Sequence, residues 1–217
     1  MSIAYMKPML KKAQSEKYGI AAFNMIDYNS ARAVVDGAQE LNAPIIIQLS
    51  VKTIKIWGFK PIGDWVRSLS ESVDVPVALH LDHCKDLDVI QRCIDAGWTS
   101  VMFDGSSLPF QENIRQTKLA YDIATSAGVG LEAEIGAIGG TEDDKFVAED
   151  DAILAVVDEC VEFCQYFPDL AVIEFLVLKL YPAVILISFE IFSLGLKVIK
   201  SLASLSDCFG ACKIGFD

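Results

Sequence analysis

Both histidines of this 217-residue chain lie in one short stretch, VALHLDHCKD, at residues 77–86. His80 and His83 are three positions apart, and Asp82 stands beside His83 where an apolar run ends. Neutral imidazole is a good zinc ligand, and a neighbouring carboxylate suits proton transfer. The stretch therefore indicates either a metal and proton-transfer site or a polar, solvated turn that contains two histidines.

Carboxylates elsewhere in the chain favour the metal site. Glu132 and Glu134 would project from one face of a predicted strand, and Asp104 ends another predicted strand. The loop GAIGGTEDD at 136–144 adds Glu142 and two aspartates among flexible glycines. Carboxylates gathered beside an imidazole would hold a divalent cation. The alternative, that these acids only account for the low pI, does not explain why they recur at equivalent strand ends.

The elements that would position these side chains form a repeating pattern. Short apolar runs, predicted as strands, alternate with longer segments of helical period, and five such units follow one another at a spacing of roughly 25 to 30 residues. This pattern predicts an α/β fold with parallel strands, either an open doubly wound sheet or a closed (β/α)8 barrel. The predicted strands are 19–24, 44–50, 75–82, 99–105 and 128–136, and the segments between and after them are 28–42, 53–73, 86–96, 109–127 and 150–165.

The alternation of side chains along the strands favours the barrel, because successive residues of a strand point to opposite faces. Each predicted strand has one apolar face and one face that becomes polar at its C-terminal end, whereas a sheet covered by helices on both sides should be apolar on both faces. The mouth of a barrel, where barrel active sites lie, has this polar character. The alternative is that these are ordinary turn residues. The polar positions are Asn24, Gln48, Ser50, His80, Asp82, Ser100, Asp104, Glu132 and Glu134.

Residues 166–217 do not continue the pattern. They are rich in Leu, Ile, Phe and Ser and show no β-α alternation, and their charge-free run between Lys179 and Glu190 is too short for a membrane span. We therefore expect an incomplete (β/α)8 barrel of about five β-α units over residues 1–165. An atypical hydrophobic segment would follow over 166–217.

Composition excludes several classes of protein. A net charge of -12 leaves no basic patch for nucleic acid, and the N-terminus contains no apolar run typical of a signal peptide. The six cysteines do not have the spacing of a small disulfide scaffold, so we expect reduced thiols in a cytoplasmic protein with no membrane partner. Cys160 with Cys164, and Cys208 with Cys212, have a spacing that is a weak alternative signal for metal binding.

An enzyme that acts on carbonyl compounds needs an electron sink. That sink is either a lysine that forms a Schiff base or a metal ion that acts as a Lewis acid. None of the five predicted strands ends in a lysine, whereas one ends in Asp82 and His83. The sequence therefore favours the metal.

Five stretches, in order, make a specific resemblance: AAFN (21–24), PIIIQLS (44–50), VALHLDHC (77–84), AGWTSVMFDGS (96–106) and LEAEIGAIGGTEDD (131–144). Over about residues 5–165 the chain resembles the class II, zinc-dependent ketose-bisphosphate aldolases of the fructose- and tagatose-bisphosphate type. The resemblance implies a (β/α)8 barrel that forms homo-oligomers. It also implies reversible cleavage of a phosphorylated sugar, a ketose bisphosphate, to dihydroxyacetone phosphate and an aldehyde.

The resemblance also implies roles for particular residues. His83 matches a zinc (Zn2+) ligand, and Asp82 matches the acid/base that serves the hydroxyl at the cleaved bond. Glu142 matches the loop acid that moves the proton on the carbon of dihydroxyacetone phosphate. The other matching positions are Glu134 and Asp104, acids at or near the metal, and Asn24 and Ser50, which contact substrate.

The chain departs from this family in its C-terminal part, which is divergent or truncated. The family takes two further zinc-binding histidines and Gly/Ser-rich phosphate loops from later strands, and this chain has no histidine after His83. Three interpretations stay open. The chain is an aldolase impaired by the loss of zinc ligands, a non-catalytic aldolase-like fragment or accessory subunit, or another metal-dependent barrel enzyme that acts on sugar phosphates.

Overall fold

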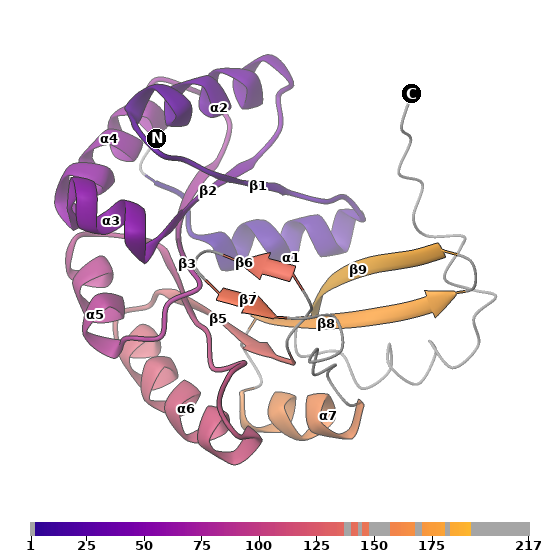
Figure 1. The fold of residues 1–217 in the computed structure, drawn as a ribbon. Coiled ribbons are helices and arrows are strands. Elements are labelled where there is room, and N and C mark those ends of the chain that lie inside the picture. Colours follow the sequence, from indigo (N-terminus) through magenta and orange to yellow (C-terminus); the bar gives the residue numbers. More distant parts are fainter. Residues whose placement is uncertain are drawn as a thin grey trace.

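The computed structural model describes residues 3–136, 140–142, 145–147, 157–167, 171–180 and 183–191. Helices and strands alternate along most of this range (Figure 1). The helices are α1 (Met6–Glu16), α2 (Tyr28–Glu40), α3 (Val51–Trp57), α4 (Phe59–Glu71), α5 (Leu87–Asp95), α6 (Phe110–Ser126) and α7 (Val157–Tyr166). The strands are β1 (Ala21–Asn24), β2 (Ile45–Ser50), β3 (Val77–Asp82), β4 (Ser100–Phe103), β5 (Gly130–Ile135), β6 (Gly140–Glu142), β7 (Lys145–Val147), β8 (Ala171–Leu180) and β9 (Ala183–Ile191).

The main sheet has the strand order β1-β2-β3-β4-β5-β8-β9. Every neighbouring pair from β1 to β8 is parallel, and only the last pair, β8 with β9, is antiparallel. The order follows the chain without a reversal, as in a barrel and unlike a doubly wound sheet. Helices α2 to α6 form an arc around one side of the curved sheet (Figure 1). The predicted α/β, barrel-type fold is confirmed, and the described strands form part of a barrel.

The outer face of the sheet packs against these helices. Helix α4 buries Ile62, Val66 and Leu69, which its helical period places on one side. The stretch 53–73, which the sequence analysis gave as one segment, belongs to two helices that break at Gly58, where φ is 86°. Glycine takes this left-handed conformation without a Cβ clash.

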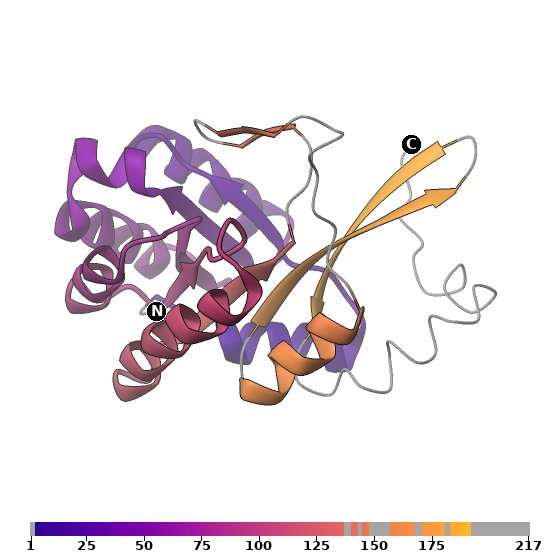
Figure 2. The same ribbon diagram turned by 60° about the horizontal axis from the view of Figure 1, so that its bottom comes forward.

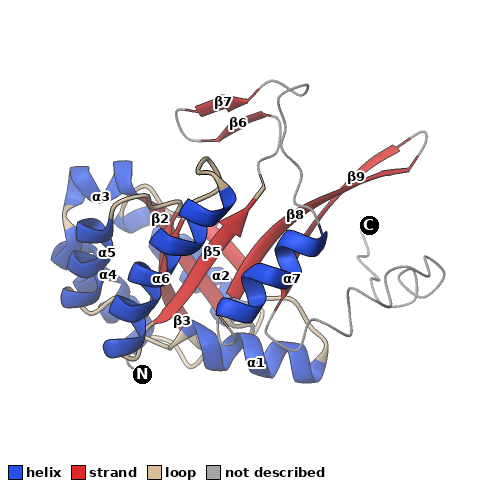
Figure 3. Cartoon of the chain, turned by 90° about the horizontal axis from the view of Figure 1, so that it is seen from below, coloured by secondary structure: helices blue, strands red, loops and turns tan. Residues whose placement is uncertain are grey.

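Helix α1, which the sequence analysis did not anticipate, covers the inner face of the sheet at its N-terminal end (Figures 2 and 3). Its residues Met6, Met9 and Leu10 pack against Ile46 and Ala78, which lie on the inward face of β2 and β3. A parallel bridge between Ala4 and Ala78 fixes the start of the helix. The inner face is therefore apolar at the N-terminal end of the strands, and the polar side chains are left at the C-terminal end.

Strand β8 extends the parallel sheet beyond residue 165. Its first residues pair with β5, from Glu132 with Ala171 to Ile135 with Glu174. The segment AVIEFLVLKL is rich in β-branched and other large apolar residues, which favour strands. The division of the chain into 1–165 and 166–217 stays a prediction, but the parallel pairing continues a few residues into the second part.

No helix in the described ranges is long and apolar enough to cross a membrane. The longest of them, α6, has 17 residues.

The packing of α1 can be tested by shortening Leu10, which is buried against the sheet. We expect Leu10→Ala to lower the free energy of unfolding by about 2 to 4 kcal/mol, because it removes buried methyl groups and leaves a cavity. Urea denaturation followed by circular dichroism measures the change. The control is Lys11→Ala, at an exposed position on the same helix, which should change stability by less than about 0.5 kcal/mol. Equal effects of the two substitutions would contradict the packing role of α1.

Candidate active site

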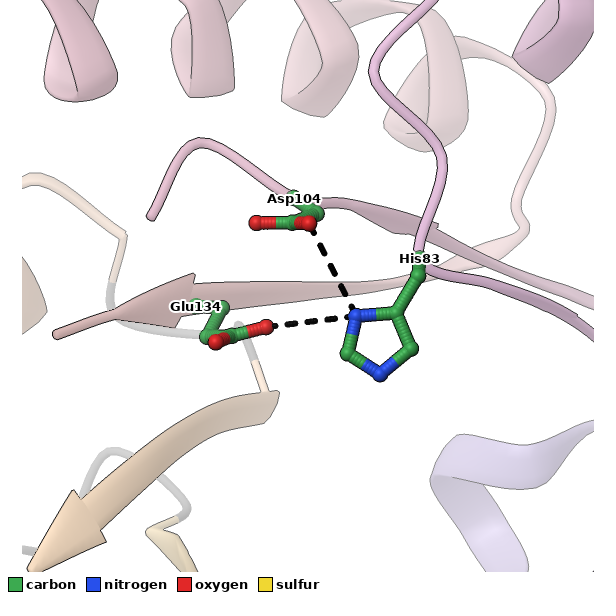
Figure 4. A group of neighbouring side chains, drawn as sticks. All are labelled: His83, Asp104 and Glu134. Atoms are coloured by element: carbon green, nitrogen blue, oxygen red, sulfur yellow. Dashed lines mark ion pairs between the residues drawn. The ribbon is translucent and has the colours of Figure 1, made fainter. Parts of the chain in front are cut away.

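His83 follows the last residue of β3 and has an unusual backbone conformation. Its φ is 44°, in the left-handed region that residues other than glycine rarely adopt. The backbone N–H of His83 points to Met102 Sδ, at 3.3 Å. This turn directs the imidazole away from β3 and toward the ends of β4 and β5 (Figure 4). Backbone strain of this kind, of order 1–3 kcal/mol, is often found at functional sites.

The imidazole faces two buried carboxylates that come from different strands. His83 Nδ1 lies 3.4 Å from Glu134 Oε2 and 3.7 Å from Asp104 Oδ2 (Figure 4). One ligand atom from each of the three residues lies within 4.8 Å of the others. Asp104 and Glu134 are only 6% and 2% exposed. A nitrogen and two carboxylate oxygens thus converge on one point, as in a site for a divalent cation.

Asp104 is held by its own loop. Its Oδ1 accepts hydrogen bonds from Ser106 N, at 3.0 Å, and from Ser106 Oγ, at 2.6 Å. Its Oδ2 faces His83 and also lies 3.4 Å from Lys85 Nζ. One carboxylate oxygen is therefore fixed by the loop, and the other is directed into the cluster.

The end of β5, which carries Glu134, is tied to helix α6. Asn113 Nδ2 donates to the Glu134 carbonyl oxygen at 2.8 Å, and Thr117 Oγ1 donates to Asn113 Oδ1 at 2.9 Å. The Asn113 side chain fills the space in which a Cβ at position 105 would lie. Gly105 is therefore the residue type that lets the chain turn after Asp104 while Asn113 reaches Glu134.

The two carboxylates favour a positive charge at His83. Hydrogen bonding to Asp104 and then to Glu134 raises the pKa of His83 to about 11, against the opposing effect of burial. Burial by itself would raise the pKa of Asp104, but hydrogen bonds from His83 and Ser106 and the charge of Lys85 outweigh it and hold that pKa well below its usual value. The site thus stabilises a cation at Nδ1. A divalent metal ion, which would replace the proton, fits this donor set and its charge.

Asp82 lies beside this cluster with one oxygen anchored. Gln48 Nε2 donates to Asp82 Oδ2 at 3.0 Å, and Asp82 Oδ1 lies 3.9 Å from His83 Nε2. Residue Ser50 pairs with Asp82 across β2 and β3. The arrangement leaves Oδ1 near the imidazole at the C-terminal end of the strands, where it can accept a proton from a bound molecule.

His80 lies one step deeper on the same face and does not join the cluster. Its Nδ1 is 2.8 Å from Ser100 Oγ, and its Nε2 is 3.6 Å from Glu132 Oε2. Burial first, and then the nearby charge of His83, lower the pKa of His80 to about 3, so its ring is neutral. The two histidines of the sequence motif therefore have different environments.

The remaining predicted site residues are placed less completely. Asn24 pairs with Gln48 at the edge of the sheet and is exposed, and Ser50 is half-buried. The backbone of Glu142 lies in β6, and its side chain lies outside the described part of the structure, as do Asp143 and Asp144. The structure thus brings His83, Asp104, Glu134 and Asp82 together.

Four supporting residues were not identified from the sequence. Gln48 was placed on the correct face, but nothing indicated its bond to Asp82. Ser106 lies two positions after Asp104, and Lys85 lies two positions after His83. This nearness in the chain was the available signal for both. Asn113 lies on a helix 21 positions from Glu134, and no sequence pattern joins them.

The cysteines in the described part of the structure do not contribute to this cluster. Among the described residues, the group that brings three metal-binding donors together is His83, Asp104 and Glu134. Cys84, which follows His83, is buried, and burial raises its pKa to about 11, so it stays a thiol. Cys160 and Cys164 lie on α7 as reduced cysteines, and Cys208 and Cys212 lie outside the described residues.

Comparison with known sequences gives a family match. A protein-family model for class II fructose-bisphosphate aldolases matches residues 4–172. A sulfofructosephosphate aldolase of Alkalicoccus urumqiensis is 42% identical over 159 residues, which cover 73% of this chain and 55% of that protein. A fructose-bisphosphate aldolase of Geobacillus stearothermophilus is 39% identical over 168 residues, covering 76% and 58%. The chain spans little more than half the length of these curated relatives.

Comparison with solved structures also finds aldolases. The YdjI aldolase of Escherichia coli K12 superposes with a TM-score of 0.66 and 29% sequence identity, over 78% of this chain and 64% of that one. A putative fructose-1,6-bisphosphate aldolase of Coccidioides immitis gives the same TM-score with 26% identity, over 76% and 61%. The described part of the fold is therefore a portion of the fold of these proteins.

The protonation of the two histidines can be tested directly, because the chain contains no others. We expect neither ring to titrate between pH 5 and 8 in the metal-free protein, since the pKa values are about 11 for His83 and about 3 for His80. NMR of the imidazole C–H groups measures this. Asp104→Asn should lower the pKa of His83. A titration near pH 6.5 in the parent chain would contradict the cluster geometry.

The same shifts give the sign of the pH dependence of stability. The raised pKa of His83 stabilises the fold fully below pH 6.5, and this contribution is lost as pH rises toward 11. The lowered pKa of His80 favours the fold above pH 6.5, and this contribution is lost as pH falls toward 3. From the histidines alone, stability should therefore be greatest near pH 6.5, and urea midpoints measured from pH 5 to 9 check this. Midpoints that rise steadily up to pH 9 would contradict the raised pKa of His83.

Metal binding tests the cluster itself. We expect the chain to bind one zinc ion with a Kd weaker than about 1 µM, because four-ligand structural sites reach about 10–16 kcal/mol and this one offers three protein donors. Isothermal titration with zinc measures it. His83→Asn, a residue type that also tolerates a positive φ, should abolish binding.

The matched control for zinc binding is Asp122→Asn, which removes an exposed carboxylate from α6. Binding by this variant should equal that of the parent chain. Nanomolar zinc affinity would contradict the expected weak binding, and equal loss in both variants would contradict the assignment of the site to His83.

Proposed function

The chain belongs to the class II fructose-bisphosphate aldolase family, and from this membership we propose that it acts in metal-dependent aldol chemistry on a phosphorylated sugar. The observation that carries the proposal is the convergence of His83, Asp104 and Glu134 beside Asp82. The reaction is cleavage of a ketose 1,6-bisphosphate to dihydroxyacetone phosphate and an aldehyde, and its reversal. The chain is then a carbon–carbon lyase.

In this proposal His83, with Asp104 and Glu134, holds a divalent cation, zinc by family resemblance. When bound, such an ion supplies Lewis-acid polarisation of a ketone carbonyl. Asp104 and Glu134 provide the negative charge that offsets the cation, and their buried, hydrogen-bonded positions fix their direction.

Asp82 is the proposed proton acceptor. The hydrogen bond from Gln48 holds Oδ2, so Oδ1 is the atom directed toward the cluster. As the carbon–carbon bond breaks, Oδ1 takes the proton of the sugar hydroxyl that becomes the aldehyde oxygen. The bonding electrons remain on the dihydroxyacetone phosphate carbon, to which Glu142 returns a proton. Asn24 and Ser50, at the C-terminal ends of β1 and β2, are proposed to contact the substrate.

The names of the relatives support a phosphorylated substrate. They include a sulfofructosephosphate, a fructose-bisphosphate and a 6-phospho-5-dehydro-2-deoxy-D-gluconate aldolase, the last from Halalkalibacterium halodurans. We propose fructose or tagatose bisphosphate for this chain, in glycolysis or related carbohydrate metabolism in the cytoplasm. We also propose that residues 1–165 act as the aldolase-like unit and residues 166–217 as a separate segment.

A second candidate function rests on the histidine count. The chain has no imidazole beyond His80 and His83, and His80 is buried and bonded to Ser100. A site with one imidazole and two carboxylates binds zinc less firmly than one with three imidazoles. The second candidate is therefore a non-catalytic, aldolase-like subunit that associates with other chains.

Substitution of Asp82 separates proton transfer from metal binding. We expect the parent chain, with excess zinc, to cleave fructose 1,6-bisphosphate or tagatose 1,6-bisphosphate slowly, and Asp82→Asn to lower kcat by roughly 100- to 10,000-fold. Zinc affinity should fall far less than kcat, by about tenfold, since Asp82 lies beside His83 but is not one of the three donors. A coupled assay for dihydroxyacetone phosphate and a zinc titration measure the two effects.

The control for the cleavage assay is Asp88→Asn, at an exposed acid in the first turn of α5, which should retain the parent activity. Absence of cleavage by the zinc-loaded parent chain on both sugars would reject the catalytic proposal and favour the second candidate. Equal activity of Asp82→Asn and the parent would reject the role of Asp82.

A further inference from the structure

Lys85 lies beside the metal-binding cluster, two positions after His83, and contacts one of its carboxylates. Lys85 Nζ is 3.4 Å from Asp104 Oδ2, and the two side chains are 49% and 8% exposed. By contrast, Lys118 pairs with Asp122 one turn away on α6, and both of those side chains are mostly exposed. Ion pairs between exposed side chains contribute little. The Lys85 ammonium differs from them because it faces a buried acid of the site.

The backbone on both sides of Lys85 is held in place. Asp104 N donates to the Cys84 carbonyl oxygen at 2.7 Å, which joins the segment before Lys85 to the residue that it contacts. After Lys85, Asp86 Oδ1 caps helix α5 by accepting from Asp88 N at 2.9 Å. The position of Lys85 next to Asp104 is therefore set by the backbone, and only its flexible side chain has to be ordered to reach the carboxylate.

The oxygen that Lys85 contacts is the one that a metal ion would use. Asp104 Oδ1 already accepts two hydrogen bonds from Ser106. Asp104 Oδ2 faces both His83 Nδ1, at 3.7 Å, and Lys85 Nζ. A divalent ion held by His83, Asp104 and Glu134 would therefore share this oxygen with the ammonium group, and like charges so close to one another repel.

We propose that Lys85 is a built-in competitor of the metal ion, whose ammonium group occupies Asp104 Oδ2 in the metal-free chain and lowers the affinity for divalent cations. Its side chain is half-exposed, so it turns toward solvent when an ion binds, and water screens part of the repulsion. Lys85 thus limits metal affinity in addition to the small number of nitrogen ligands. This inference rests on the metal site of the proposed function and concerns the regulation of that site.

Zinc binding by Lys85→Gln tests the proposal, because glutamine removes the positive charge and keeps a polar side chain. We expect the zinc Kd of this variant, measured by isothermal titration of the full chain, to be about tenfold lower than that of the parent chain. Lys85→Arg keeps the positive charge and should bind zinc as the parent chain does. The visible spectrum of bound Co2+ should be the same in the parent chain and in Lys85→Gln, because the three donors are unchanged.

The matched control is Lys118→Gln, which removes an exposed ammonium group from α6 and should leave the zinc Kd unchanged. A zinc Kd of Lys85→Gln that equals or exceeds that of the parent chain would overturn the inference about Lys85 and leave the proposed metal site standing. Equal tightening in Lys85→Arg or in Lys118→Gln, or a changed Co2+ spectrum, would overturn it as well. Absence of zinc binding in the parent chain and in every variant would overturn both the metal site and the role of Lys85.

Discussion

The burial of two carboxylates beside one imidazole is the interaction on which the site depends. A carboxylate taken out of water is costly unless a positive charge or hydrogen bonds compensate it. Asp104 and Glu134 are both nearly inaccessible, and His83 Nδ1 is within 4 Å of each. The imidazole must therefore either keep its proton or share the position with a cation. This requirement explains why His83 adopts a left-handed backbone, since an extended residue 83 would continue β3 and point elsewhere.

The separation of the inner face into an apolar end and a polar end makes this burial possible. Helix α1 packs Met6, Met9 and Leu10 against the N-terminal end of this face, below the site. His80, with its neighbours Ser100 and Glu132, lies above α1, and Asp82, Asp104 and Glu134 follow one step later at the C-terminal ends of β3, β4 and β5. Each layer is set by the pairing register, in which Gln48 faces His80 and Ser50 faces Asp82. A register shift of one residue would move every one of these side chains to the helix-covered face.

The polar face of each strand was predictable from the sequence, whereas contacts between distant segments were not. Alternation along β3 and β5 placed Asp82 and Glu134 on one face, because a strand has a fixed period of two. Helix α1 was missed because its short apolar stripe, interrupted by lysines and a proline, carries little signal by itself and is stabilised by the sheet beneath it. The link from Asn113 to Glu134 was also missed, because it depends on how α6 packs, and its only local sign is a glycine at position 105. The extension of the sheet by β8 was also not predicted. The apolar composition of residues 171–180 does not by itself distinguish a strand from a helix.

The balance of charge bears on how the site would treat a metal ion. Without metal, the protonated imidazole and Lys85 offset most of the charge of Asp82, Asp104 and Glu134. A divalent ion would enter only by displacing the proton that these same acids hold on Nδ1, so the feature that attracts the ion also opposes its entry. In a site with several imidazoles, the additional nitrogen ligands offset the free-energy cost of removing this proton. Here Nδ1 is the only nitrogen among the three described donors. Metal occupancy of this chain should therefore depend on pH and on free metal concentration far more than it would in a site with three histidines.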